Sequence, residues 1–188
     1  NFAAAACGRT RGPERSARMI LVSACLIRHD FQDVNANYLD WLAACYDARV
    51  FLPVCPAQLA GLPRMYEAEL RRIHRVDYRR GPVLNQCQGM LVSESGERWP
   101  DAEDKLSVPL KRLILNQDIS APILAENSPT CGVHLVYDGH FRGKREEGQG
   151  IATTILQALS IPCYSSREIT KLEVAQLVRK DLEYYYQA

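Results

Sequence analysis

Residues 19–25 read MILVSAC, a short apolar run that ends in small residues and a cysteine. Such a run is typical of a strand that is buried on both faces, as in a parallel sheet. Three later stretches have the same character: VFLPVCP at 50–56, APILAE at 121–126 and IPCYSS at 161–166. Together the four stretches predict the core strands of one mostly parallel sheet.

Helical patterns lie between these strands. They occupy residues 35–48, 67–75, 101–118 and 150–160. A capping-box spacing at Ser165 and Glu168 predicts the start of a final helix. Strands that alternate with helices predict an α/β fold, here a single domain over 19–188 with flanking helices and Rossmann-like layering. Residues 1–18 show neither the helical nor the strand periodicity of apolar residues, and we expect a tail or a processed leader there.

Three local signals refine this picture. Pro109 is expected near the start of a helix or at a kink. The pair Asp138 and Gly139, inside VHLVYDGHF, predicts a tight hairpin with a type I′ turn. Residues 76–100 are expected to hold short strands or a hairpin.

The composition is that of an ordinary globular domain. The 188 residues are 47% hydrophobic and 24% charged, with a formal net charge of +1, so the balance requires no nucleic acid or anionic membrane as a partner. No apolar run is long enough to cross a bilayer, and no secretory signal opens the sequence. We expect a cytoplasmic protein that binds neither membrane nor nucleic acid, and the oligomeric state stays open.

Cysteine usage is the first pointer to chemistry. The seven cysteines are Cys7, Cys25, Cys45, Cys55, Cys87, Cys131 and Cys163. An odd number without a secretory signal favours reduced thiols, for metal binding or catalysis, over disulfides. Cys45 and Cys163 lie on apolar stretches and are predicted to be core residues.

Three of the cysteines come just after predicted strands. Cys25 follows ILVSA, Cys55 follows FLPV, and Cys131 follows ILAENSPT. The carboxyl ends of parallel strands lie at one edge of a sheet, where ligands bind, so the fold should bring these thiols together. They would suit zinc or an iron–sulfur cluster with one iron lacking a protein ligand. The alternative is that all three are buried and inert.

Five motifs carry a resemblance to a known family. ILVSACL, PVCP followed by GLP, NSPTCG, YDGHFRGK and GQGI stand in the order found in the 2-thiouracil desulfurase family, over residues 19–165. The resemblance implies that Cys25, Cys55 and Cys131 bind a [4Fe-4S] cluster. It also implies a non-redox desulfuration of a thiolated pyrimidine base or nucleotide, in which C=S becomes C=O and sulfide is released.

The chain departs from the family pattern around the predicted pocket. Ala57 and Gln58 follow PVCP, where the family usually has a glutamate, and Ala60 stands where it usually has a glycine. The stretch IRHDFQD at 27–33 replaces the family's usual loop after the first motif. The departures support a cluster more strongly than the family's substrate. The alternative is a non-catalytic relative that keeps a metal site, or only the fold, and binds a nucleotide or a partner protein.

Further candidate residues surround these motifs. The catalytic candidates are Glu126, Ser128 and Asp138, and the substrate-binding candidates are Ser23, Thr130, Gly132, Tyr137, Lys144, Gly148 and Gly150. The competing explanations are that Glu126 is solvated, that the hydroxyls of Ser128 and Thr130 bond the backbone of their own turn, and that Asp138 serves only the hairpin. The glycine-rich loop with its lysine, just before a helix, would suit the phosphate of a thiolated nucleotide.

Overall fold

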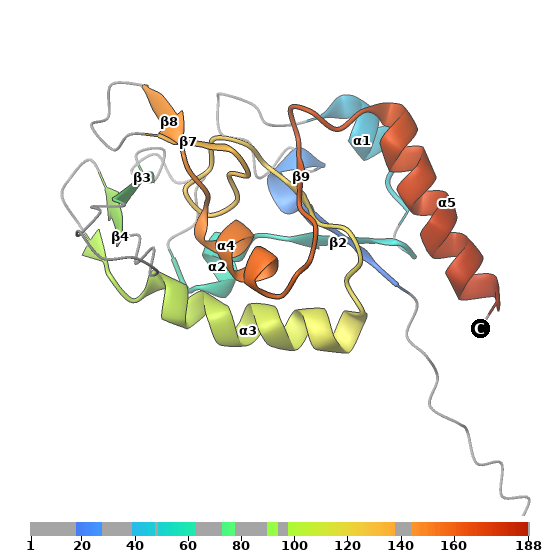
Figure 1. Cartoon of the computed structure of the whole chain (residues 1–188), viewed down its shortest axis with the longest axis horizontal. Helices are drawn as coiled ribbons and strands as arrows, with labels where there is room; N and C mark the ends of the chain where they lie inside the picture. Colours follow the sequence, from blue (N-terminus) through green and yellow to red (C-terminus); the bar gives the residue numbers. More distant parts are fainter. Residues whose placement is uncertain are drawn as a thin grey trace, which may run out of the picture.

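A four-stranded parallel sheet forms the centre of the protein (Figure 1). The computed structural model describes residues 18–27, 39–47, 49–62, 73–77, 90–93, 98–137 and 144–187. The strands of the central sheet are β1 (Ile20–Ser23), β2 (Phe51–Val54), β6 (Ile123–Leu124) and β9 (Tyr164–Ser165). Their order is β2-β1-β6-β9 and every pairing is parallel. All four predicted core strands are therefore confirmed.

Strand β1 is an inner strand of this sheet, and its sequence shows why. Ile20, Leu21 and Val22 have no exposed surface, as expected for side chains that are covered on both faces. Val22 pairs with Pro53 of β2 on one side and with Ile123 of β6 on the other. The carboxyl end of β1 therefore lies between those of β2 and β6.

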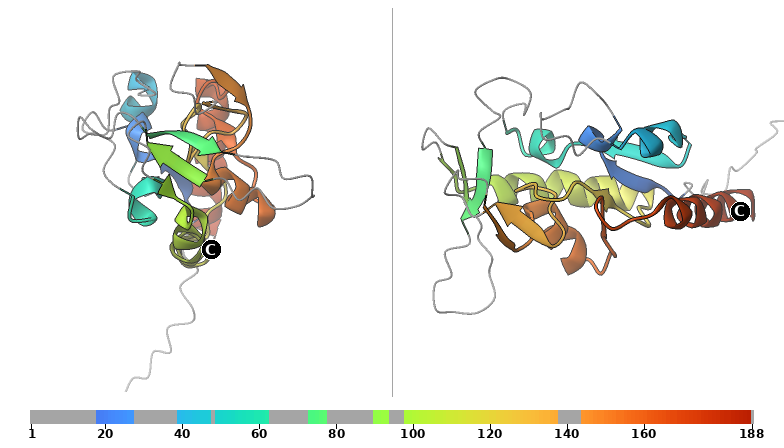
Figure 2. Two further views of the ribbon diagram at one scale, coloured as in Figure 1. Left: turned by 90° about the vertical axis from the view of Figure 1, so that its left-hand side faces the viewer. Right: turned by 90° about the horizontal axis from the view of Figure 1, so that it is seen from above.

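Helices cover both faces of the sheet. They are α1 (Asp40–Ala44), α2 (Pro56–Leu59), α3 (Ala102–Gln117), α4 (Ile151–Ala158) and α5 (Lys171–Gln187). In Figure 1, α3 lies below the sheet, whereas α1 and the start of α5 lie above it. Figure 2 shows α2 and α4 on either side of α3. These layers confirm the predicted α/β class.

Helix α3 buries one stripe against the core and includes a proline in its interior. Leu106, Leu110 and Ile114 are buried at helical spacing. Pro109 lies inside the helix and not near its start. The helix continues through this position because the buried stripe on both sides of it stabilises the helical backbone by packing.

A small antiparallel sheet corrects one prediction and confirms another. It consists of β3 (Ile73–Asp77), β4 (Met90–Ser93) and β5 (Arg98–Trp99), in that order. The helix predicted over 67–75 is wrong at its end, because Ile73–Asp77 pairs with β4 as a strand. Pairing with a neighbouring strand overrides local helix propensity here. The short strands expected within 76–100 are present.

The predicted hairpin exists with a longer connection. Strand β7 (Leu135–Tyr137) pairs with β8 (Arg145–Glu147), and Tyr137 is opposite Arg145. A two-residue turn at 138–139 is therefore wrong, since it would place residue 140 opposite Tyr137. Extra pairing at the far end, where the Gly148 amide donates to the His134 carbonyl at 2.9 Å, fixes the observed register.

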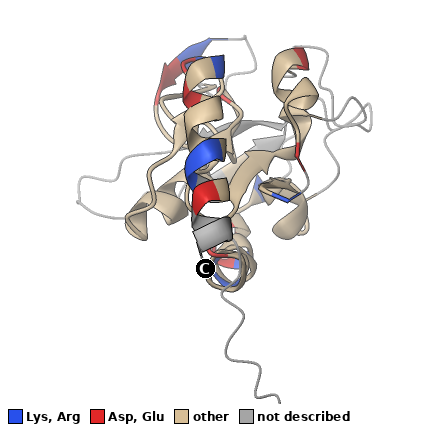
Figure 3. Ribbon diagram, turned by 90° about the vertical axis from the view of Figure 1, so that its right-hand side faces the viewer, with Lys and Arg blue, Asp and Glu red and all other residues tan. Residues whose placement is uncertain are grey.

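The capping box of the last helix lies further along the chain than predicted. The Thr170 amide donates to the Glu173 carboxylate at 2.8 Å, and the Glu173 amide donates to Thr170 Oγ1 at 3.2 Å. This reciprocal pair starts α5, whereas Ser165 lies in β9. Basic and acidic positions are interspersed along α5 (Figure 3). In the part of the chain that the structure describes, no helix combines the length and the hydropathy needed to span a membrane.

Candidate metal centre

Three cysteines follow three neighbouring strands of the central sheet. Cys25 lies in a 3-10 turn, η1 (Ala24–Leu26), directly after β1, and Cys55 is the N-cap residue of α2, directly after β2. Cys131 lies in the loop that follows β6. Because β2, β1 and β6 are adjacent and parallel, all three residues lie at the carboxyl edge of the sheet. None of the five cysteines in the described residues forms a disulfide.

The backbone of Cys131 is held from both sides. Its amide donates to Ser128 Oγ at 3.1 Å, and its carbonyl accepts from Thr153 Oγ1 of α4 at 2.9 Å. The Gly132 amide donates to the Ser128 carbonyl at 2.7 Å, which closes a tight turn around the cysteine. A side chain at residue 131 is therefore fixed relative to both β6 and α4. The sequence did not reveal Thr153, since no local signal links it to a loop 22 residues upstream.

Three hydroxyl groups surround the Cys131 thiol. Burial raises the pKa of Cys131, while hydrogen bonds from Ser23, Thr130 and Ser128 act in the opposite direction because they favour the thiolate. Thr130 Oγ1 lies 3.6 Å from Cys131 Sγ. Ser23, the last residue of β1, also accepts the Ala125 amide at 3.0 Å and so links the ends of β1 and β6.

The Cys55 thiol interacts electrostatically with Cys131. The pKa of Cys55 is raised to about 11, mainly by burial and in part by a charge on Cys131, while the amides of Gln58 and Ala57 act in the opposite direction. A thiolate at Cys55 would therefore be desolvated and would repel a second thiolate at Cys131. A cationic group bound by both sulfurs would offset both the desolvation of the thiolates and the repulsion between them.

The other two described cysteines correct predictions. Cys45 is exposed, not part of the core. Cys163 is half-buried, donates to the Ile161 carbonyl at 3.6 Å and precedes β9. Burial, together with a smaller contribution from a charge on Cys131, raises the pKa of Cys163 to about 12. Both residues lie next to short elements, α1 and β9, that leave them at the margin of the core.

The three thiols have the donor chemistry of an iron–sulfur cluster. Within the described residues, no three His, Cys, Asp or Glu side chains lie close enough together to hold one metal ion. The ligating sulfurs of a cubane cluster lie farther apart than the ligands of one ion, because iron atoms separate them. Three buried or half-buried thiols on one edge are the soft donors that iron–sulfur clusters take.

Two glycines allow close backbone contacts at the Cys131 loop: Gly150 where the loop meets α4, and Gly132 within the loop and toward β7. A Cβ atom on Gly150 would lie 2.4 Å from the Thr130 carbonyl carbon, and one on Gly132 would lie 2.6 Å from the Leu135 oxygen. The amides of Gly150, Ile151 and Ala152 donate to loop carbonyls. These amides cannot also bind a phosphate, so the start of α4 holds the loop in place of the predicted phosphate site.

The remaining substrate-binding candidates lie on the β7–β8 hairpin. The guanidinium of Arg145 lies 5.9 Å from the centre of the Tyr137 ring, and Lys144 is exposed. The Gly148 amide is used in strand pairing, so this glycine also has a structural explanation. Asp138 lies outside the described residues.

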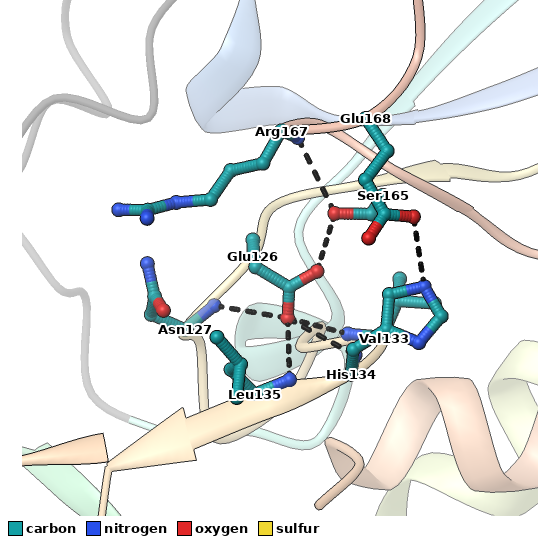
Figure 4. A network of polar contacts seen from close by, with 8 residues as sticks. All are labelled: Glu126, Asn127, Val133, His134, Leu135, Ser165, Arg167 and Glu168. Atoms are coloured by element: carbon teal, nitrogen blue, oxygen red, sulfur yellow. Dashed lines mark hydrogen bonds and ion pairs between the residues drawn. The ribbon is translucent and has the colours of Figure 1, made fainter. Parts of the chain in front are cut away.

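Glu126 is buried and its carboxylate accepts hydrogen bonds at both oxygens (Figure 4). Burial raises its pKa, but hydrogen bonds from Ser165 and from the amides of Leu135, His134 and Asn127 outweigh that effect, and the pKa lies below its ordinary value. A carboxylate held ionised by so many donors is a weak base. The geometry therefore assigns Glu126 a structural role in place of the predicted general base.

The fold and this edge define a class of protein: an α/β domain with a thiol-lined site at the carboxyl ends of parallel strands. The model of the 2-thiouracil desulfurase family matches residues 20–168. The chain therefore belongs to the 2-thiouracil desulfurase family, a family of enzymes, and the predicted resemblance is confirmed.

Two individual proteins illustrate this similarity. The uncharacterized protein YbbK of Bacillus subtilis (strain 168) is 30% identical over 161 residues, which cover 82% of this chain and 99% of YbbK. The solved structure of the [4Fe-4S]-dependent thiouracil desulfidase TudS superposes with a TM-score of 0.63 and 29% sequence identity. That similarity covers 86% of this chain and 99% of TudS.

Proposed function

We propose that the protein is an iron–sulfur-dependent desulfurase that acts on a thiolated pyrimidine base or nucleotide. In this proposal Cys25, Cys55 and Cys131 hold a [4Fe-4S] cluster. The observation that carries the proposal is the adjacency of β2, β1 and β6, each followed by one of these cysteines. The similarity to TudS, which is [4Fe-4S]-dependent, supports the choice of cofactor. A cytoplasmic location belongs to the same proposal, because the thiols must stay reduced.

The proposed reaction is a hydrolysis without electron transfer. The oxygen of a water molecule forms a bond to the ring carbon, the carbon–sulfur bond breaks, and the sulfur leaves as hydrosulfide. When bound, the cluster would supply a Lewis-acidic iron that polarises the C=S group. The chain's own residues then have to orient the substrate and manage the protons of the attacking water.

Ser128 is the residue best placed to handle a proton beside Cys131. Its Oγ accepts the amides of Thr130 at 3.3 Å and Cys131 at 3.1 Å, and it lies 3.2 Å from Thr130 Oγ1. Two N–H donors withdraw electron density from this oxygen, so its hydroxyl becomes a better proton donor. We assign Ser128 to proton transfer at the substrate, with the Thr130 hydroxyl as its partner.

A second candidate function is cofactor binding without desulfuration. Ala57 is buried and lies at the start of α2, next to the Cys55 ligand, where the family usually carries a glutamate. Glu126 is poorly suited to replace it as a base, because it is buried and hydrogen bonds to both of its oxygens stabilise the ionised carboxylate. Asp138, outside the described residues, is the base candidate that the desulfurase proposal retains.

Anaerobic reconstitution tests both candidates. The desulfurase proposal expects about four iron atoms per chain, a brown protein, and sulfide release from 2-thiouracil or from its nucleotide. Faster release from the nucleotide would support a phosphate contact by Lys144. Full iron content without sulfide release from either compound would favour the non-catalytic function, and a failure to bind iron would refute both.

A further inference from the structure

We propose that Glu126 is the positioning residue of the cofactor site: its buried carboxylate closes the Cys131 loop and fixes where the thiol points. This inference rests on the proposed function for its consequence, cluster binding. Its structural part concerns the loop alone and can be tested in the protein without metal. The residues that carry it are shown in Figure 4.

One carboxylate oxygen of Glu126 organises the far end of the loop. Oε1 accepts the amides of Val133 at 3.1 Å, His134 at 3.1 Å and Leu135 at 2.8 Å. Three successive amides that converge on one oxygen form a concave anion-binding nest, of the kind that normally binds a free anion. Here the anion is a side chain from the start of the same loop.

The other oxygen ties the loop to the edge strand of the sheet. Oε2 accepts the hydroxyl of Ser165 in β9, and Ser165 Oγ in turn accepts the Arg167 amide at 3.3 Å. The Glu126 amide donates to Ser166 Oγ at 3.0 Å. Glu126 thus joins the ends of β6 and β9 to the start of β7.

These contacts turn the Cys131 loop into a closed ring. The loop leaves the sheet at Glu126, and its return at Val133 is bonded to the Glu126 side chain. Cys131 is part of the chain segment that forms this ring, two residues before Val133, the first of the three amides that bind the carboxylate. Removing the carboxylate leaves three buried or half-buried amides without an acceptor, and the ring opens where it returns toward β7.

The contacts also separate this role from catalysis. Glu126 accepts five hydrogen bonds: the amides of Asn127, Val133, His134 and Leu135 donate to Oε1, and the Ser165 hydroxyl donates to Oε2. It is 2% exposed. Because the carboxylate is buried and its hydrogen bonds stabilise the ionised form, it is poorly suited to take a proton from water, and we infer that Glu126 acts through the position of Cys131.

The test compares Glu126→Ala and Glu126→Gln with a matched control, Glu168→Gln. Glutamine can still accept the three amides through its carbonyl oxygen, and its NH2 group can donate to Ser165 Oγ. Glu168 lies near the network but pairs with the exposed His134 side chain at 3.0 Å. Its neutralisation therefore removes a carboxylate of the same region without opening the ring.

Thiol protection is the readout that does not require a bound cluster. In metal-free, reduced protein, alkylation of Cys131 by N-ethylmaleimide is followed by peptide mass spectrometry. Glu126→Ala should raise its rate about tenfold, the effect of losing one buried hydrogen bond on local opening. Glu126→Gln should stay within about threefold of the wild type, and Glu168→Gln should match the wild type. Equal Cys131 rates in Glu126→Ala and wild type would overturn the inference.

Iron binding is the second readout. After anaerobic reconstitution, Glu126→Ala should hold less than half the wild-type iron per chain, and Glu126→Gln should recover most of it. If wild type binds no iron but Glu126→Ala still exposes Cys131, the proposed function fails and the positioning role stands. If wild type and Glu126→Ala bind iron equally, the positioning role fails. Should Glu126→Ala not fold, amide exchange in the wild type decides the same question. The amides of Val133, His134 and Leu135, which are bonded to the buried carboxylate, should exchange at least about tenfold more slowly than unbonded amides; exchange as fast as that of unbonded amides refutes the closed ring.

Discussion

A single methyl group on Gly150 should separate α4 from the Cys131 loop. In Gly150→Ala the new Cβ would lie 2.4 Å from the Thr130 carbonyl carbon and 2.5 Å from the Cys131 nitrogen. Carbon atoms in contact need about 3.5 Å, so the two backbones must move apart by about 1 Å. The hydrogen bonds of the Gly150 and Ala152 amides, both 2.8 Å long, would then stretch beyond the usual limit of about 3.2 Å.

The expected loss of stability follows from these contacts. Overpacking costs about 1–3 kcal/mol, and each of the two lost hydrogen bonds adds about 1 kcal/mol. A total of about 3–5 kcal/mol lowers the thermal midpoint of a chain of this size by about 6–20 °C. Because the displaced loop carries Cys131, the iron bound after anaerobic reconstitution should fall as well.

Gly61→Ala is the matched control. Gly61 has a φ of +68° and a Cβ there would meet nothing within 4 Å, so alanine costs about 1–2 kcal/mol of backbone strain and touches no part of the thiol site. Thermal unfolding and iron analysis are run on both variants. The reasoning is refuted if Gly150→Ala keeps both the wild-type midpoint and full iron, or if Gly61→Ala loses iron to the same degree.

Three further expectations concern other residues. Cys131→Ser should abolish the visible absorption of the cluster with little change in the thermal midpoint, whereas Cys163→Ser should keep its iron; equal iron in both would contradict the ligand assignment. The pKa of Glu126 in the folded protein lies below its ordinary value of 4.5, so the stability it contributes is present above that pH and is lost as the pH falls through the folded pKa. In Glu126→Gln the denaturation midpoint should therefore depend less on pH below about pH 5, and an unchanged pH profile would count against an ionised Glu126. Thr170→Ala removes the cap of α5 and should cost about 1 kcal/mol without changing iron content, which urea unfolding and iron analysis can check.

The core strands, and the location of three cysteines at one edge of the sheet, could both be predicted from the sequence because both follow from a parallel sheet. A strand of a parallel sheet that has helices on both faces is covered on both sides, so MILVSAC and the three similar stretches are apolar at most positions. Cys25, Cys55 and Cys131 then needed only one further rule, that parallel strands end on the same edge. The observed order β2-β1-β6 agrees with that rule.

Predictions from local sequence patterns were wrong where a residue distant in the sequence supplied the stabilising contact. Residues 73–75 end a stretch with a helical pattern, yet they pair with β4 as part of strand β3. The Asp138–Gly139 pair predicts a tight turn, yet Tyr137 pairs with Arg145. The Ser165–Glu168 spacing matches a capping box, but Ser165 donates to Glu126. In each case a tertiary hydrogen bond outweighed a preference of less than about 1 kcal/mol per residue.

The details that shape the thiol site were decided by the tertiary structure alone. Glu126 and Ser165 are 39 residues apart, and Thr153 lies 22 residues from Cys131. No sequence period links positions at such separations, because their contact exists only after β6, β9 and α4 have packed. The apolar pattern thus determined the sheet and the edge on which the cysteines stand, whereas the packing of α4 and β9 decided which buried hydrogen bonds hold Cys131 in place.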